Sequence, residues 1–207
     1  MITTNVIIPE NERTKSKWDI EENRGFQWKI VNHERKYKVF VNHRSKKNIE
    51  KVVLLLNYIE QYVEYLKYYL PYNTSPKSNQ YIAHQNVFID TPHIFQEIGS
   101  GTLYEGINKP KNIIHIQHPP KLFSKDNQYR AGYRLIMLSL RTKTGNLRTW
   151  NKIKRLLLHE LAHTMCNHIT YREEGNHEKD FDDCESILHN VASLGPVKEF
   201  ENNFKRL

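Results

Sequence analysis

The chain has 207 residues, of which 38% are hydrophobic and 26% charged, and this composition is that of a globular protein long enough to bury a core. Its two cysteines form no C-x-x-C pair, and the first residues lack the basic and apolar regions of a secretory signal, so we expect an intracellular, cytoplasmic or nuclear, protein without a disulfide scaffold. The longest apolar stretches are far shorter than the roughly 20 residues that span a bilayer, which argues against membrane insertion.

The formal net charge of +8 is unevenly distributed. Residues 106–158 contain 12 Lys and Arg against one Asp, a balance of +11, whereas residues 159–207 contain 5 basic and 10 acidic residues, a balance of −5. A second basic run, residues 24–51, has 9 basic residues against 2 acidic ones, or +7. Basic surface of this kind favours a polyanion such as nucleic acid, and solvated lysines on strands and loops are an equally good explanation.

The N-terminal part of the chain predicts an arm followed by a β-hairpin. Residues 1–23 are polar and irregular. From Phe26 to Val31, and again from Tyr37 to Val41, apolar and polar residues alternate with the period of a strand. We therefore expect an N-terminal arm and hairpin over residues 1–46 and a second unit over residues 47–207, unless the two form one continuous domain.

A long amphipathic helix is predicted from Lys47 to Leu70, because apolar residues recur there at steps of three and four and Pro71 follows. Its tyrosines spread around the helix, which indicates a packing helix with a partly exposed aromatic rim. Residues 71–80 have the composition of a loop.

Residues 81–120 give weaker patterns. The apolar clusters Val87–Ile89 and Ile113–Ile116 predict short strands, with Gly99, Gly101 and Gly106 around turns. Four histidines in this part of the chain have no metal-binding spacing, so we interpret them as surface residues or hydrogen-bonded core residues: His84, His93, His115 and His118.

A strand is predicted from Tyr133 to Arg141, followed by a turn from Thr142 to Arg148. Thr149 is a suitable N-cap for the next helix, which begins at Trp150. The apolar side of that helix consists of Trp150, Ile153, Leu156, Leu157 and Leu161. Zinc peptidases use this layout of strand, turn and helix, and the strand that borders their cleft can hold an extended substrate by main-chain pairing.

The helix ends in the motif H-E-x-x-H, formed by His159, Glu160 and His163. At about 100° per residue, positions four apart lie on one helix face, so both imidazoles can bind one ion. Glu160 then lies beside the metal, where a general base takes a proton from a water that Zn²⁺ has acidified. The motif predicts two zinc ligands, His159 and His163, and one catalytic residue, Glu160.

Catalytic zinc needs a third protein ligand. His168 lies about half a turn from His159 on a continuous helix and faces the wrong side. Glu185 on the next helix is one candidate, with Asp182 and Asp183 as lesser ones. His177 is the preferred candidate, because the preceding Gly175 and Asn176 allow a turn toward the metal and neutral imidazole suits zinc.

The stretch HELAHTMCNHITYREEGNHEKDF resembles the site of the WLM-domain metalloproteases, relatives of the SprT and Spartan proteases, whose pattern is H-E-L-x-H followed by G-P-H-x-x-x-F. Gly175, His177 and Phe181 match that spacing, Asn176 replaces the proline, and the strand YRLIMLSLR resembles the strand before the family's active helix. The resemblance covers about residues 128–194. It implies a zinc peptidase linked to DNA and to the removal of proteins crosslinked to it, with the basic surface holding nucleic acid.

The remaining apolar series, from Phe181 to Leu194, predicts a helix closed by Gly195 and Pro196. Cys166 and Cys184 are interpreted as core residues. The expected fold is α+β and zincin-like, with a small mixed sheet packed on the active-site helix, a long supporting helix and a C-terminal helix. Two alternatives stay open: a regulatory zinc peptidase with Glu185 as third ligand and no DNA role, and a non-catalytic nucleic-acid-binding protein with a structural zinc.

Overall fold

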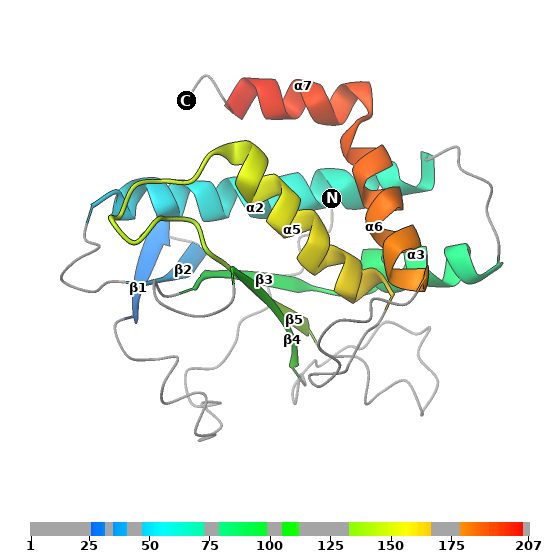
Figure 1. Cartoon of the computed structure of the whole chain (residues 1–207), viewed down its shortest axis with the longest axis horizontal. Coiled ribbons are helices and arrows are strands. Elements are labelled where there is room, and N and C mark those ends of the chain that lie inside the picture. The colour runs from blue at the N-terminus through cyan, green and yellow to red at the C-terminus, as the bar shows by residue number, and fades with distance from the viewer. Residues whose placement is uncertain are drawn as a thin grey trace.

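The computed structural model describes residues 26–31, 35–40, 47–72, 79–98, 105–111, 133–166 and 179–204. The arm at residues 1–23 and the apolar cluster Ile113–Ile116 lie outside these ranges. Five strands and five α-helices make up the described part, with a 3-10 turn at Leu70–Tyr72 (Figure 1). They are β1 Phe26–Val31, β2 Arg35–Phe40, α2 Ile49–Tyr69, α3 Asn79–Asp90, β3 His93–Glu97, β4 Gly106–Lys111, β5 Tyr133–Leu138, α5 Trp150–Met165, α6 Lys179–Ala192 and α7 Gly195–Phe204.

The strands form one mixed sheet in the order β1-β2-β3-β5-β4. β3 is parallel to both of its neighbours, β2 and β5. The two outer pairs are antiparallel: β1 with β2, and β4 with β5. In Figure 1 the helices α2 and α5 lie over one face of this sheet, and α7 lies over them on the side away from it. The α+β class and the small mixed sheet predicted from the sequence are therefore confirmed.

The predicted hairpin is confirmed, with its second strand at Arg35–Phe40 rather than Tyr37–Val41. Tyr37 and Val39 are buried, as the alternating pattern requires. The hairpin belongs to the same sheet as the rest of the chain, because Lys38 pairs with Gln96 of β3. The division of the chain at residue 46 stays a prediction.

The long helix is confirmed as α2. Its apolar face is fully covered and includes two of the tyrosines, while Tyr65 and Tyr68 are exposed at its rim. Asn48 precedes the helix in a left-handed conformation, with φ of 64°, which Asn adopts more readily than most residues. Pro71 falls in the 3-10 turn that ends it.

Two predictions for residues 81–120 are wrong. Val87–Ile89 lies in the helix α3, where Gln85 and Phe88 are buried one turn apart, so three apolar residues in a row were too short a pattern to distinguish strand from helix. Gly106 begins the strand β4 instead of a turn. β3 was not predicted at all, because its end carries the polar residues Gln96 and Glu97, both of which are buried.

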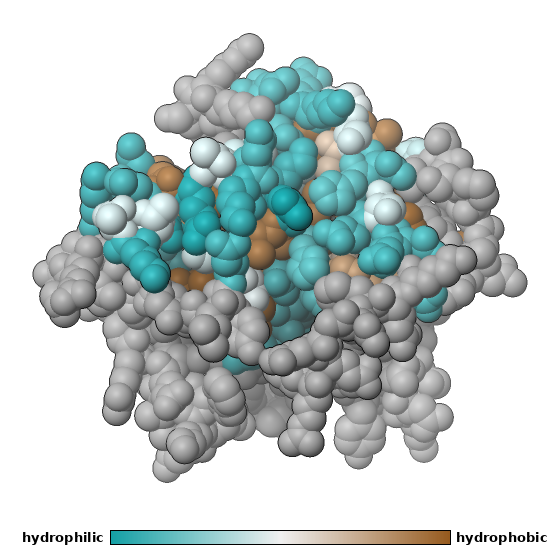
Figure 2. Space-filling model, in the orientation of Figure 1, coloured by the Kyte–Doolittle hydropathy of each residue, from teal (hydrophilic) through white to brown (hydrophobic). Residues whose placement is uncertain are grey.

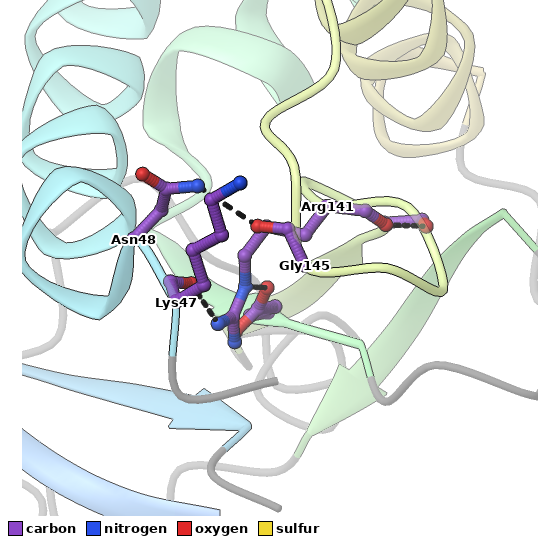
Figure 3. A network of polar contacts seen from close by, with 6 residues as sticks. Lys47, Asn48, Arg141 and Gly145 are labelled. Carbon is purple, nitrogen blue, oxygen red and sulfur yellow. Dashed lines mark hydrogen bonds and ion pairs between the residues drawn. The ribbon is translucent and has the colours of Figure 1, made fainter. Parts of the chain in front are cut away.

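The turn between β5 and α5 is fastened to the start of α2 (Figure 3). Arg141 donates from Nε and Nη2 to the two carboxylate oxygens of Glu97, each at 2.7 Å, and from Nη1 to the carbonyl of Lys47 at 2.9 Å. Asn48 donates its side-chain amide to the carbonyl of Gly145 at 2.9 Å. This network fixes where α5 leaves the sheet, and the turn predicted for residues 142–148 is confirmed by the bridge between Arg141 and Leu147.

The C-terminal part of the chain contains one more helix than the sequence predicted. Gly195 and Pro196 do not simply close α6 but begin α7. Proline is tolerated there because the N–H groups of the first helical turn have no acceptor within the helix, so the missing N–H of proline costs no hydrogen bond. Glu201 of α7 is buried and accepts hydrogen bonds from the hydroxyl of Tyr62 at 2.8 Å and from the indole of Trp150 at 3.3 Å. α7 is thereby attached to both α2 and α5.

Figure 2 shows that the described part of this face is mostly hydrophilic, with hydrophobic surface in small areas between. Among the helices of the described ranges, none combines the length and the apolar character that crossing a bilayer requires.

Candidate metal centre

His159, Glu160 and His163 all lie on α5, as predicted, within the last two turns of the helix. The rings of His159 and His163 are neighbours, with centroids 5.1 Å apart and planes at 88°. Both histidines are only half-buried. Both rings contact the buried ring of Phe181 on α6, with centroid distances of 5.0 Å for His159 and 4.5 Å for His163. The helix thus presents two imidazoles side by side at the junction of α5 and α6.

Glu160 lies on a different side of the helix from these two rings, toward the sheet. It is 5% exposed, and its carboxylate lies against Gly106 of β4: a Cβ at Gly106 would meet Oε1 of Glu160 at 2.3 Å. Burial raises the pKa of Glu160 to about 8. A carboxyl of this kind is a stronger base than a solvated one, which is what proton transfer near neutral pH requires.

β4 lies along α5 and forms the edge of the sheet within the described residues. Asn108 donates its side-chain amide to the carbonyl oxygen of Glu160 and to Oγ1 of Thr164, the latter at 2.8 Å. Gly106 and Asn108 therefore hold two successive turns of the motif helix against an edge strand. The other strand of this pair, β5, is interior, so β4 is the edge strand that lies against the motif.

Sequence reasoning missed Gly106 and Asn108. The alternation of Gly106 and Asn108 with Ile107 and Lys109 is the only signal for this strand, and it is too short and too polar to predict one. Only the fold reveals that a glycine is required where the strand meets the side chain of Glu160.

The third ligand is the open part of the site. His177, together with His168, Gly175 and Asn176, lies outside the described residues. Glu185 is described: its Oε1 lies 3.5 Å from Nδ1 of His159, and the two side chains are 27% and 34% exposed. Asp182 and Asp183 are exposed on α6. Glu185 is therefore the acidic residue of α6 that the fold brings to the motif.

A second imidazole lies near the same carboxylate. Nε2 of His189, one turn further along α6, is 4.0 Å from Oε1 of Glu185. In the ranges that the structure describes, no three His, Cys, Asp or Glu side chains come together as a ready metal-binding group. The donor types present, two neighbouring imidazoles with a carboxylate beside one of them, are nonetheless those that Zn²⁺ takes in proteins.

Cys166 and Cys184 are buried, which confirms their interpretation as core residues. A hydrogen bond with Cys166 and burial raise the pKa of the Cys184 thiol. A raised pKa keeps a thiol protonated and therefore a poor nucleophile.

Much of the basic run at residues 106–158 is occupied by contacts within the protein. Arg141 is buried with Glu97, Lys154 pairs with Glu201, and Arg148 and Lys152 both pair with Glu105, at 3.0 and 2.7 Å. Arg155, which precedes His159 by one turn on α5, is exposed. The surface charge available to a polyanion is thus smaller than the sequence count indicates.

Comparisons of the chain with models of protein families, with curated proteins and with solved structures found no match.

Proposed function

We propose that this protein is a zinc-dependent endopeptidase with a zincin-like active site. The observation that carries the proposal is that the three motif residues face two different surroundings. His159 and His163 present neighbouring imidazoles, while Glu160, which lies between them in the sequence, is buried against an edge strand. A fortuitous H-E-x-x-H string on a surface or core helix has no reason to meet a glycine on a neighbouring strand at the position of its glutamate.

In this proposal His159 and His163 hold the metal with one further ligand, either His177 or Glu185. When bound, Zn²⁺ supplies Lewis-acid polarisation of a substrate carbonyl and makes a water molecule more acidic. Glu160 accepts the proton of the attacking water and passes it to the departing amine nitrogen. Asn108 holds the backbone of Glu160 in place for both proton transfers.

The edge strand β4 favours a polypeptide as the class of substrate. β4 is the last strand of the sheet that the described residues form, with β5 as its neighbour in the strand order. An extended chain can pair with such an edge by main-chain hydrogen bonds, which bind polypeptides without selecting a sequence. A peptide bound there lies next to the helix that carries the two histidines.

The test is cleavage of an unfolded protein substrate by the zinc-loaded protein and its Glu160→Gln variant. Gln has the size of Glu but cannot accept the proton, so the variant should bind zinc with the native stoichiometry and lose cleavage by about 100-fold or more. Glu199→Gln, an exposed change on α7, is the matched control and should cleave normally. Cleavage by Glu160→Gln at the native rate would contradict the mechanism.

A DNA-associated role, as the resemblance to the WLM and SprT proteases implies, is part of this proposal and rests on the net charge of +8 and on exposed cations such as Arg155. It predicts cleavage that DNA stimulates and that salt suppresses. Cleavage indifferent to DNA would favour the regulatory peptidase. Salt-sensitive DNA binding without hydrolysis of any substrate would favour the non-catalytic alternative.

A further inference from the structure

The carboxylate of Glu185 approaches His159 from a specific side of the ring. Oε1 is 3.5 Å from Nδ1, the ring nitrogen next to the side-chain stem. A neutral imidazole carries one N–H and one lone pair, on different nitrogens. An acceptor beside Nδ1 favours the tautomer with the proton there, and that tautomer has its lone pair on Nε2, the outer nitrogen.

Metal-binding histidines in proteins almost always donate their second nitrogen to a carboxylate, a carbonyl or a water, which fixes the ring and makes the ligating nitrogen more basic. Glu185 stands where that acceptor belongs. Its oxygen lies 3.5 Å from Nδ1, so an ion held on Nε2 of the same ring would lie on the far side of the imidazole from this carboxylate.

The packing of α6 on α5 fixes the positions of Glu185 and His159 relative to each other. Phe181, one turn before Glu185 on α6, is fully buried and packs its ring on both histidines of α5. Cys184, next to Glu185, is buried as well. The backbone of α6 is thus fixed against α5 just before Glu185. The Glu185 carboxylate therefore extends toward His159 from a helix whose position is set by packing.

We propose that Glu185 is a positioning residue for the metal centre: it accepts the Nδ1–H of His159 and thereby presents Nε2 to the ion. The proposal rests on the proposed zinc site and deepens it. It assigns Glu185 a role that the sequence left open, and it leaves the third coordination position to another residue. His189, with Nε2 4.0 Å from the same oxygen, is a second neighbour of this carboxylate.

Two substitutions separate a positioning residue from a ligand. Glu185→Gln keeps an oxygen of the same reach for the Nδ1–H, whereas Glu185→Ala removes the acceptor. For a positioning residue, zinc binds to both variants at native stoichiometry, with affinity reduced by about 10- to 100-fold in Ala and by less in Gln. Glu199→Gln is the control and should bind zinc as the native protein does. Zinc affinity is measured by competition with a chelator of known strength.

The spectroscopic readout is the ¹⁵N spectrum of labelled histidine in the zinc-loaded protein, with the His159 signals identified by their loss in His159→Gln. The expected spectrum shows His159 protonated at Nδ1 and ligated through Nε2, and Glu185→Gln should keep that tautomer while shifting the Nδ1–H proton. This second variant carries the test even if Glu185→Ala does not fold.

Three results would overturn the inference. Equal loss of zinc in the Gln and Ala variants, far beyond 100-fold, would make Glu185 a ligand. Native affinity in both variants together with an unchanged Nδ1–H signal would mean that Glu185 does not act on His159. A native protein that binds no zinc would overturn the proposed function itself, and this inference with it.

Discussion

Gly106 and Glu160 lie so close together that only a hydrogen atom fits between them, since a Cβ on Gly106 would sit 2.3 Å from Oε1 and 2.9 Å from Cδ of Glu160. The edge strand therefore determines where the carboxylate of the motif can point. Any larger side chain at residue 106 must push that carboxylate, or the neighbouring side chain of Leu156, out of place.

Gly106→Ala should lower kcat/KM for peptide cleavage by about 100-fold, the usual effect of misplacing a catalytic group by about 1 Å. Zinc affinity should change little, because both histidines pack on Phe181 of α6. Gly195→Ala is the matched control, since nothing lies within 4 Å of a Cβ there. Peptidase kinetics together with zinc titration check both statements, and a Gly106→Ala variant with native kcat/KM would show that β4 does not position Glu160.

Arg141→Met should lower the free energy of unfolding by about 3–5 kcal/mol, because it removes the guanidinium that pairs with the buried carboxylate of Glu97. The two side chains are each 3% exposed, so solvent cannot replace the lost contact. The double variant Glu97→Gln with Arg141→Met should cost less than the two single changes added together. Urea unfolding measures all three.

Lys152→Ala is the exposed counterpart of that experiment. Lys152 pairs with Glu105 at 2.7 Å, but both side chains are nearly half exposed. The expected loss in unfolding free energy is below about 1 kcal/mol. A loss similar to that of Arg141→Met would mean that burial does not decide how strongly these ion pairs stabilise the fold.

The buried ring of His93 should make the protein sensitive to acid. Neither ring nitrogen has a hydrogen-bond partner among the described residues, and burial, with the charges of Lys67 and Arg134 adding to it, lowers the pKa of His93 well below its usual value. The folded protein therefore holds this ring neutral while the unfolded chain protonates it below about pH 6.5. Stability from this group is fully present above that pH and is lost as the pH falls.

His93→Phe should remove that dependence. One proton taken up on unfolding corresponds to about 1.4 kcal/mol per pH unit below the unfolded pKa. The free energy of unfolding of the native protein, measured between pH 7 and pH 5, should fall more steeply than that of the Phe variant by an amount approaching this slope. Parallel curves would mean that His93 is protonated in the folded state.

Glu201→Ala should lower the free energy of unfolding by at least about 2 kcal/mol, because it deprives the buried hydroxyl of Tyr62 of its acceptor and Lys154 of its ion-pair partner. Glu199→Ala, an exposed change two residues earlier, should stay within about 0.5 kcal/mol of the native value. Trp150, whose indole donates to Glu201, reports the change by its fluorescence.

The sequence was sufficient to predict an element of secondary structure wherever many consecutive residues repeat the period of a helix or a strand. The helix α2, the hairpin and the motif helix α5 were all predicted, because many residues of each repeat one period. Thr149 was placed correctly at the N-cap of α5, although its side chain makes no capping hydrogen bond.

The rest depended on contacts between distant segments. β3 carries the buried residues Gln96 and Glu97, which look like surface residues until Arg141 is seen to pair with Glu97. Gly106 looked like a turn residue until β4 was seen to press on Glu160. The preferred third ligand, His177, was chosen from spacing and resemblance and stays a prediction, while the position of Glu185 beside His159 emerged only from the packing of α6 on α5.

The hydrogen bond between Tyr62 and Glu201 joins residues 139 positions apart in the chain. During synthesis on a ribosome, α2 emerges long before α7 exists, so the aromatic face of α2 and the start of the motif helix wait without their cover. Contacts of such long range close late and slow folding. The packing of α2 and of the start of α5 is therefore completed only when α7 docks, after every other described element has been made.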